Sequence, residues 1–181
     1  MYNNKWVINM NNLDFIFTRE SVRNYDSRKI TKEDLDLILK ASMQGPSCLN
    51  LKDYSFIVIQ NKDTLVELSN LIGNTAKPLL NATLAIVVLM DDSRAYKEAV
   101  DYDVLDSTIA AQNIMLAANA LNIGSVMLGI YPQKERMEKI RSYFNLPSHI
   151  RANSIISLGY KVEKTVGKNH FEENRIHYEK W

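Results

Sequence analysis

The segment from Leu84 to Met90 is an unbroken run of apolar residues, and it constrains the fold more than any other feature of the sequence. A strand with one face in water would alternate apolar and polar residues. This run does not, so it predicts a strand that is buried on both faces at the centre of a sheet. Asp91, Asp92 and Ser93 follow directly and end the strand. We therefore expect helices to cover the sheet.

A second apolar segment, from about Val104 to Leu121, is rich in Ala, Ile, Leu and Met and predicts a long helix that is buried on every side. Strands that alternate with helices are typical of an α/β or α+β sandwich in which helices cover a small sheet. The other expected helices run from after Thr31 to before Gly45, over 63–72 and around 137–144, and the other expected strands cover 56–59, 125–130 and 154–160.

Length and composition indicate one ordinary globular domain. The chain has 181 residues, of which 46% are hydrophobic and 24% charged. Lys and Arg total 22 and Asp and Glu total 21, so the net charge of +1 gives no general attraction to nucleic acid or to an anionic membrane. Residues 13–181 are predicted to form the domain, and residues 1–12 are predicted to be an N-terminal extension without an assigned function.

Several kinds of site are not indicated. Cys48 is the only cysteine, so no intramolecular disulfide can form, and the His residues lack the spacing of zinc ligands. The glycines form neither a dinucleotide fingerprint nor a phosphate-binding loop, so a bound phosphate would be held by side chains. The sequence has neither a membrane-spanning run nor a signal peptide. We expect a cytoplasmic protein with no metal centre.

Arg19, Ser21 and Arg23 could form a small anion-binding site just before the first long helix. The two guanidinium groups would share one side whether the segment is helical or extended. Guanidinium groups bind phosphate through paired, charge-assisted hydrogen bonds, and the serine hydroxyl can add a third donor. On spacing alone, a solvated basic surface segment is the simpler interpretation.

Three blocks of sequence together resemble a known family. Arg19-x-Ser21-x-Arg23 is followed, after one helix, by Gly45-Pro46-Ser47-Cys48-Leu49-Asn50 and, after the long apolar helix, by Gly124-Ser125-Val126-Met127-Leu128-Gly129. In order and spacing these blocks are similar to those of the FMN-dependent nitroreductases, and the similarity runs from about residue 13 to the C-terminus. The resemblance implies an α+β sandwich with a central mixed sheet flanked by helices. It also implies an intertwined homodimer with FMN at the subunit interface and a C-terminal extension that reaches over the partner.

The resemblance further implies which residues hold FMN. Arg19, Ser21 and Arg23 would contact its phosphate, ribityl chain and pyrimidine edge, and Leu128 and Gly129 would offer backbone groups near flavin N5. Pro46, Ser47 and Asn50 would come from the other subunit and line the ring. Asn74 and Lys77 have the spacing of the family's ribityl-binding pair. Lys168 and His170 are the nearest match to a basic pair on the phosphate, although His170 stands where family members often have arginine, and Arg175 is an alternative.

The implied activity is that of an oxidoreductase in which flavin N5, and no catalytic side chain, is the reactive centre. Two electrons would pass from NADH or NADPH to a nitroaromatic, a quinone or a similar small-molecule acceptor in a ping-pong cycle. The segment Lys52-Asp53-Tyr54 replaces the family's usual Gln-Pro-Trp and leaves substrate choice open. The alternatives are another flavin reaction on the same fold, such as dehalogenation or enone reduction, a non-catalytic flavin-binding or redox-sensing protein, and an interaction module without FMN. The aromatic C-terminus, ending at Trp181, is expected to pack against another surface.

Overall fold

The structure is a computed structural model and describes residues 13–99, 101–162 and 170–181. Its four-stranded sheet has the order β1-β2-β4-β3, with β1 at Tyr54–Ile59, β2 at Leu84–Asp91, β3 at Ile123–Gly129 and β4 at Ile150–Tyr160. These strands all pair antiparallel with their neighbours. A mixed sheet also requires parallel pairing. Among the described residues, parallel pairing occurs only at an isolated bridge between Ser21 and Ser125, on the outer edge of β3.

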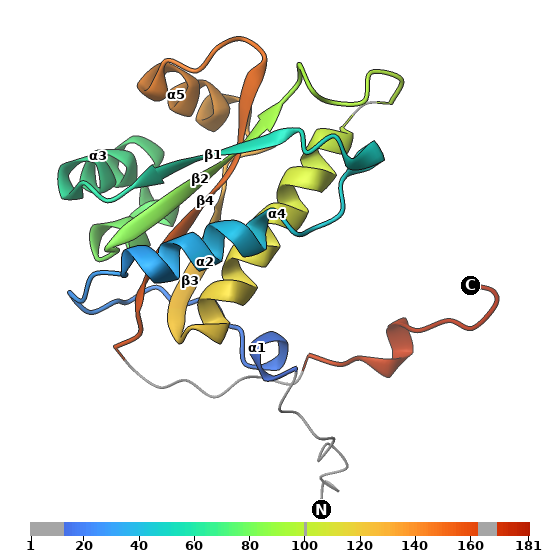
Figure 1. The fold of residues 1–181 in the computed structure, drawn as a ribbon, viewed down its shortest axis with the longest axis horizontal. Helices are drawn as coiled ribbons and strands as arrows, with labels where there is room; N and C mark the ends of the chain where they lie inside the picture. Colours follow the sequence, from blue (N-terminus) through green and yellow to red (C-terminus); the bar gives the residue numbers. More distant parts are fainter. Residues whose placement is uncertain (1–12, 100, 163–169) are drawn as a thin grey trace, which may run out of the picture.

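Strand β2 confirms the prediction of a strand buried on both faces, because Leu84 to Met90 are all buried. Alternate side chains of β2 enter two separate cores. Val87 and Leu89 pack with α3 (Lys62–Ile72), the 3-10 turn η3 (Asn74–Leu80) and α5 (Lys134–Phe144). Ile86 and Val88 pack with α2 (Lys32–Ser42) and α4 (Tyr102–Ala120), which cross one face of the sheet in Figure 1. The α+β sandwich is therefore confirmed.

Short polar signals set the ends of the helices. The Thr31 side chain accepts a hydrogen bond from the backbone N–H of Asp34 (3.1 Å) and caps α2, which begins after Thr31 as the sequence predicts. Asn61 caps α3 in the same way, through the backbone N–H of Thr64 (3.0 Å). Gly73 ends α3 with φ 91°, a backbone conformation that favours glycine.

The sequence predicts that helix α4 is buried on every side. Within one chain, it is buried toward the sheet and toward α2, and another side stays open. Ala111, Ile114 and Ala118 have no exposed surface, whereas Leu105 is 58% exposed. Residues that share the side of Leu105 at helical spacing are Ile109, Gln112 and Leu116, and together these four form what we term the outer face of α4. No helix in the described part of the chain is long and apolar enough to cross a membrane.

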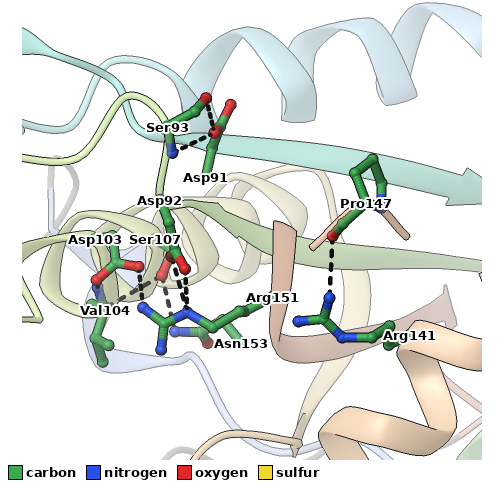
Figure 2. Close-up of polar contacts among 10 residues, drawn as sticks. All are labelled: Asp91, Asp92, Ser93, Asp103, Val104, Ser107, Arg141, Pro147, Arg151 and Asn153. Atoms are coloured by element: carbon green, nitrogen blue, oxygen red, sulfur yellow. Dashed lines mark hydrogen bonds and ion pairs between the residues drawn. The ribbon is translucent and has the colours of Figure 1, made fainter. Parts of the chain in front are cut away.

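A polar network fixes the first turns of α4 to the sheet (Figure 2). The Arg151 guanidinium, on β4, pairs with Asp92 after β2 (Nε to Oδ1, 2.8 Å) and with Asp103 on α4 (Nη2 to Oδ2, 2.5 Å). Two residues further along β4, the Asn153 amide donates to the hydroxyl of Ser107 (2.9 Å). These bonds satisfy carboxylates and hydroxyls that would otherwise be costly to bury, so the register of α4 against β4 is well determined.

The segment after α1 (Asp14–Phe17) is extended and docks on the edge of the sheet. The backbone N–H of Val22 donates to the Ser125 carbonyl (2.9 Å), and the Tyr25 hydroxyl donates to the Val22 carbonyl (2.6 Å). Burial raises the pKa of Tyr25 to about 12, so its hydroxyl remains a donor at neutral pH. The Tyr25 ring lies so close to Gly159 that a Cβ on this glycine would be 2.7 Å from it. Glycine is therefore required for this docking.

We expect Gly159→Ala to lower the free energy of unfolding by about 1–3 kcal/mol, because the added methyl group pushes the Tyr25 ring off β4. Urea unfolding followed by circular dichroism measures the change. Gly129→Ala is the matched control on the adjacent strand, since a Cβ there meets nothing within 4 Å, and it should shift the free energy of unfolding by less than about 0.5 kcal/mol. Equal losses for both variants would contradict the proposed close contact.

Candidate functional site

A hollow of about 790 Å³ opens beside the last residues of β3, and we term it the β3 hollow. Its walls come from the docked segment, from η3, from β3 and from the beginning of α5. It brings together five residues that the sequence resemblance predicts: Arg23, Asn74, Lys77, Leu128 and Gly129. This volume is in the range of pockets that bind a single small ligand.

Ser21 lies in an adjoining hollow of about 560 Å³ that shares Arg23, Asn24 and Asn81 with the β3 hollow. The segment is extended, as one of the two predicted geometries requires, and the Arg23 guanidinium donates to the Ser21 carbonyl (3.2 Å). Arg19 lines neither hollow. The single chain thus places Ser21 and Arg23 together but leaves Arg19 apart from them.

The lining of the β3 hollow is cationic. Arg23, Lys77 and Arg136 reach it, and no carboxylate among the described residues does. Within the described part of the chain, none of these three cations forms an ion pair. Asn74 and Asn81 add amide donors to the same wall. A set of donors with unneutralised positive charge is suited to an anionic ligand.

The edge of β3 adds backbone groups to this lining. β3 is an outer strand, and its Ser125 carbonyl points away from β4 and accepts a hydrogen bond from Val22. Backbone groups alternate in direction along a strand, so those of Met127 and Gly129 also point away from β4. The same alternation directs the backbone groups of Leu128 toward its β4 partner, Ile155. Gly129 has open space beside its Cα, so a flat ligand can approach the backbone there.

Pro46, Ser47 and Asn50 do not line the β3 hollow of their own chain. Their segment is held against the first turns of α4, where the Cys48 backbone N–H donates to the Asp106 carboxylate (2.8 Å). The 3-10 turn η2 (Cys48–Asn50) contains positive φ angles and leaves Leu49 73% exposed. The segment is thus anchored to its own chain but presents side chains outward.

Of the predicted basic pair near the C-terminus, Lys168 lies outside the described residues. His170 is exposed and does not line the β3 hollow. It belongs to the arm 170–181, which extends away from the sheet in Figure 1 and includes a fully exposed Trp181 (101%). Arg175 pairs with Glu172 within the arm (2.8 Å). In one chain, therefore, neither His170 nor Arg175 reaches the hollow.

The sequence analysis missed Asn24, Asn81 and Arg136 as lining residues. Arg136 lies in the first turn of α5, and its guanidinium donates to the Gly129 carbonyl (3.0 Å). No local pattern identifies these side chains, because docking of the early segment and folding back of α5 bring them to the hollow. Clusters of His, Cys, Asp and Glu that could hold a metal ion are not found among the described residues.

The unusual residue Asp53 lies behind the Cys48 segment and is fully buried. Its carboxylate oxygens have no hydrogen-bond partner in the described residues. Burial, and next the neighbouring Asp106 carboxylate, raise the pKa of Asp53 to about 6. A proton on Asp53 removes the repulsion between the two carboxylates, so this buried site binds the proton more tightly than a free aspartate does.

Comparison with known proteins assigns the family. The model of the Nitroreductase family matches residues 16–79 and 74–160, so the chain belongs to the nitroreductase family, which consists of oxidoreductases. Two relatives are both named "Putative NADH dehydrogenase/NAD(P)H nitroreductase". The Archaeoglobus fulgidus protein is 42% identical over 93% of this chain and 98% of its own length, and the Methanothermobacter thermautotrophicus protein is 38% identical over 97% and 90%. The structure of an FMN-dependent nitroreductase from Clostridium difficile R20291 superposes with a TM-score of 0.85 at 30% identity, covering 93% of this chain and 99% of that one.

Asp53 should make stability depend on pH. Its pKa is about 6 in the folded chain and 3.8 as a free side chain, so folding favours the proton, and the stabilisation is lost as the pH rises through about 6. We expect Asp53→Asn to be more stable than the wild type by about 1 kcal/mol at pH 8, with a smaller gain at pH 5. Urea unfolding at both pH values measures this. Asp63→Asn, at an exposed position of α3, should show no such change between the two pH values.

Proposed function

We propose that the protein is an FMN-dependent NAD(P)H oxidoreductase that acts as a homodimer in the cytoplasm. The observation that carries this proposal is the cationic, donor-rich β3 hollow, whose lining includes no carboxylate among the described residues. FMN is an anion with a polar, hydrogen-bonding ring, so the donor set fits it. The relative from Clostridium difficile is named FMN-dependent, and the archaeal relatives are named for NAD(P)H, which supports the same assignment.

Different residues of the two hollows would bind different parts of FMN. Arg23 and Lys77, together with Ser21 and Asn74 as uncharged donors, would bind the phosphate and ribityl chain of FMN. Gly129, at the open edge of β3, would present its backbone to the ring. When bound, FMN supplies the redox chemistry, because it takes a hydride from NAD(P)H and passes two electrons to an acceptor.

The acceptor would be a nitroaromatic, a quinone or a similar small molecule, and it would use the place that NAD(P)+ has left, in a ping-pong cycle. The side chains of the hollow are donors and cations, and none is required as a catalytic acid or base. Their role is to orient the bound molecules and to offset negative charge.

The homodimer would complete the site. Leu105 on the outer face of α4 (58% exposed), together with Leu13 (45%), Ile16 (44%) and Phe17 (49%) at α1, forms apolar surface that a single chain leaves in water. A second copy would cover this surface, and the segment that contains Pro46, Ser47 and Asn50 would then reach the partner's hollow. The arm 170–181, with its exposed Phe171 (54%), Tyr178 (83%) and Trp181, would pack on the partner.

Flavin binding and reduction test the proposal directly. We expect the purified chain to bind FMN, and its flavin absorbance to be bleached by NADH or NADPH without oxygen and restored by a quinone or a nitroaromatic. A flavin that neither nicotinamide reduces would favour a non-catalytic flavoprotein. A chain that binds no FMN would overturn the proposal.

Arg23→Ala should weaken FMN binding by about tenfold or more, since it removes a charge-assisted contact. Arg28→Ala, which removes an exposed arginine paired with Asp26, should leave FMN binding unchanged.

The dimer is tested at Leu105, on the outer face of α4. Leu105→Glu places a charge in the proposed apolar interface, so we expect a monomer in sedimentation equilibrium and at least about tenfold weaker FMN binding. Val58→Glu introduces the same charge at a 37% exposed position on the opposite edge strand, and it should remain a dimer with normal FMN affinity. A wild-type monomer that binds FMN tightly would refute the role of the second copy.

A further inference from the structure

The proposed function, on which this inference rests, leaves one cation of the β3 hollow without a role. The resemblance to the family assigns Arg23 and Lys77 but not Arg136. Arg136 is half-buried in the first turn of α5, on the side of the sheet that α3 also covers (Figure 1). It thus reaches the hollow from an element separate from those that carry the other two cations.

One nitrogen of the Arg136 guanidinium forms a hydrogen bond that positions the side chain. Nη1 donates to the Gly129 carbonyl (3.0 Å), and this carbonyl lies on the open edge of β3. A guanidinium has further N–H donors, and the one bond to Gly129 leaves most of them available. The neighbouring carboxylate of Glu135 pairs with Lys139 (2.7 Å) and, within the described part of the chain, forms no ion pair with Arg136. The result is a positioned positive charge beside the backbone that would face the flavin ring.

A positive charge at this place distinguishes the two redox forms of FMN. Two-electron reduction by NAD(P)H adds two electrons and one proton to the flavin, so the ring gains one negative charge, while NAD(P)H leaves as NAD(P)+. A cation near the ring stabilises this reduced form more than the neutral oxidised ring. A cation that contacts only the phosphate stabilises both forms equally, because the phosphate charge does not change.

We infer that Arg136 is a positioning and charge-supplying residue for the flavin ring, which raises the reduction potential of bound FMN and holds the Gly129 edge against it. Its action is separate from the phosphate binding proposed for Arg23. Loss of Arg136 should therefore lower the affinity for reduced FMN more than the affinity for oxidised FMN.

The test is the reduction potential of bound FMN, measured by equilibration with a dye of known potential. Arg136→Gln keeps a donor for Gly129 but removes the charge, and we expect the ratio of reduced to oxidised affinity to fall about tenfold, which is a potential lower by about 30 mV. Arg136→Lys restores the charge and should stay within about twofold of the wild-type ratio. Lys134→Gln removes a neighbouring charge of α5 that does not line the hollow, and it should leave the potential unchanged.

The outcomes separate the two proposals. If wild-type protein binds no FMN, the proposed function itself fails. If FMN binds and Arg136→Gln has the wild-type potential, or if Arg136→Lys loses as much as Arg136→Gln, the inference about charge is wrong. Should Arg136→Gln not fold, Gln133→Glu places a carboxylate in the same wall and leaves Arg136 in position. It should lower the potential in the same direction, and an unchanged potential would again overturn the inference.

Discussion

Helix α4 is the element on which the rest of the molecule depends, because it has apolar side chains on two opposite sides. Toward the sheet, Ala111, Ile114 and Ala118 complete one of the two cores. Away from the sheet, a single chain leaves Leu105 on the outer face 58% exposed and Ile109 and Leu116 half-buried. Burial of apolar area is the main source of stability for the core contact and would be the same for the proposed dimer contact. In the proposed dimer, a helix of this composition would therefore link the folding of one chain to its association with another.

Two polar regions of the molecule handle charge in opposite ways. Near the beginning of α4, the buried carboxylate of Asp103 pairs with Arg151, while burial and the neighbouring Asp106 carboxylate raise the pKa of Asp53 to about 6. In the β3 hollow, Arg23, Lys77 and Arg136 form no ion pairs within the described residues. Charge that the protein does not compensate internally is available for a ligand. This contrast distinguishes a structural polar cluster from a candidate binding site.

The sequence predicts the elements whose signals are local. The apolar run of β2 and the Thr31 cap of α2 are visible from neighbouring residues, and the structure confirms both. The burial of α4 was overestimated for one chain, because composition shows that a face is apolar but not which surface covers it. Arg136 could not be predicted from spacing, since its place beside Gly129 depends on how α5 folds back after β3. The outward direction of Met127 and Gly129 likewise requires the register of β3 against its neighbours.

The departure at Lys52-Asp53-Tyr54 lies outside the β3 hollow of its own chain. Asp53 is buried beside Asp106, and Asp106 holds the backbone N–H of Cys48. This places the altered residue directly behind the segment that would line the ring of the partner's FMN. Any effect of the substitution on the acceptor would therefore be transmitted through the position of that segment and across the dimer interface. Within one subunit, Asp53 and Asp106 also affect folding stability. The repulsion between their carboxylates lowers the free energy of unfolding when both are ionised, because Asp53 is buried.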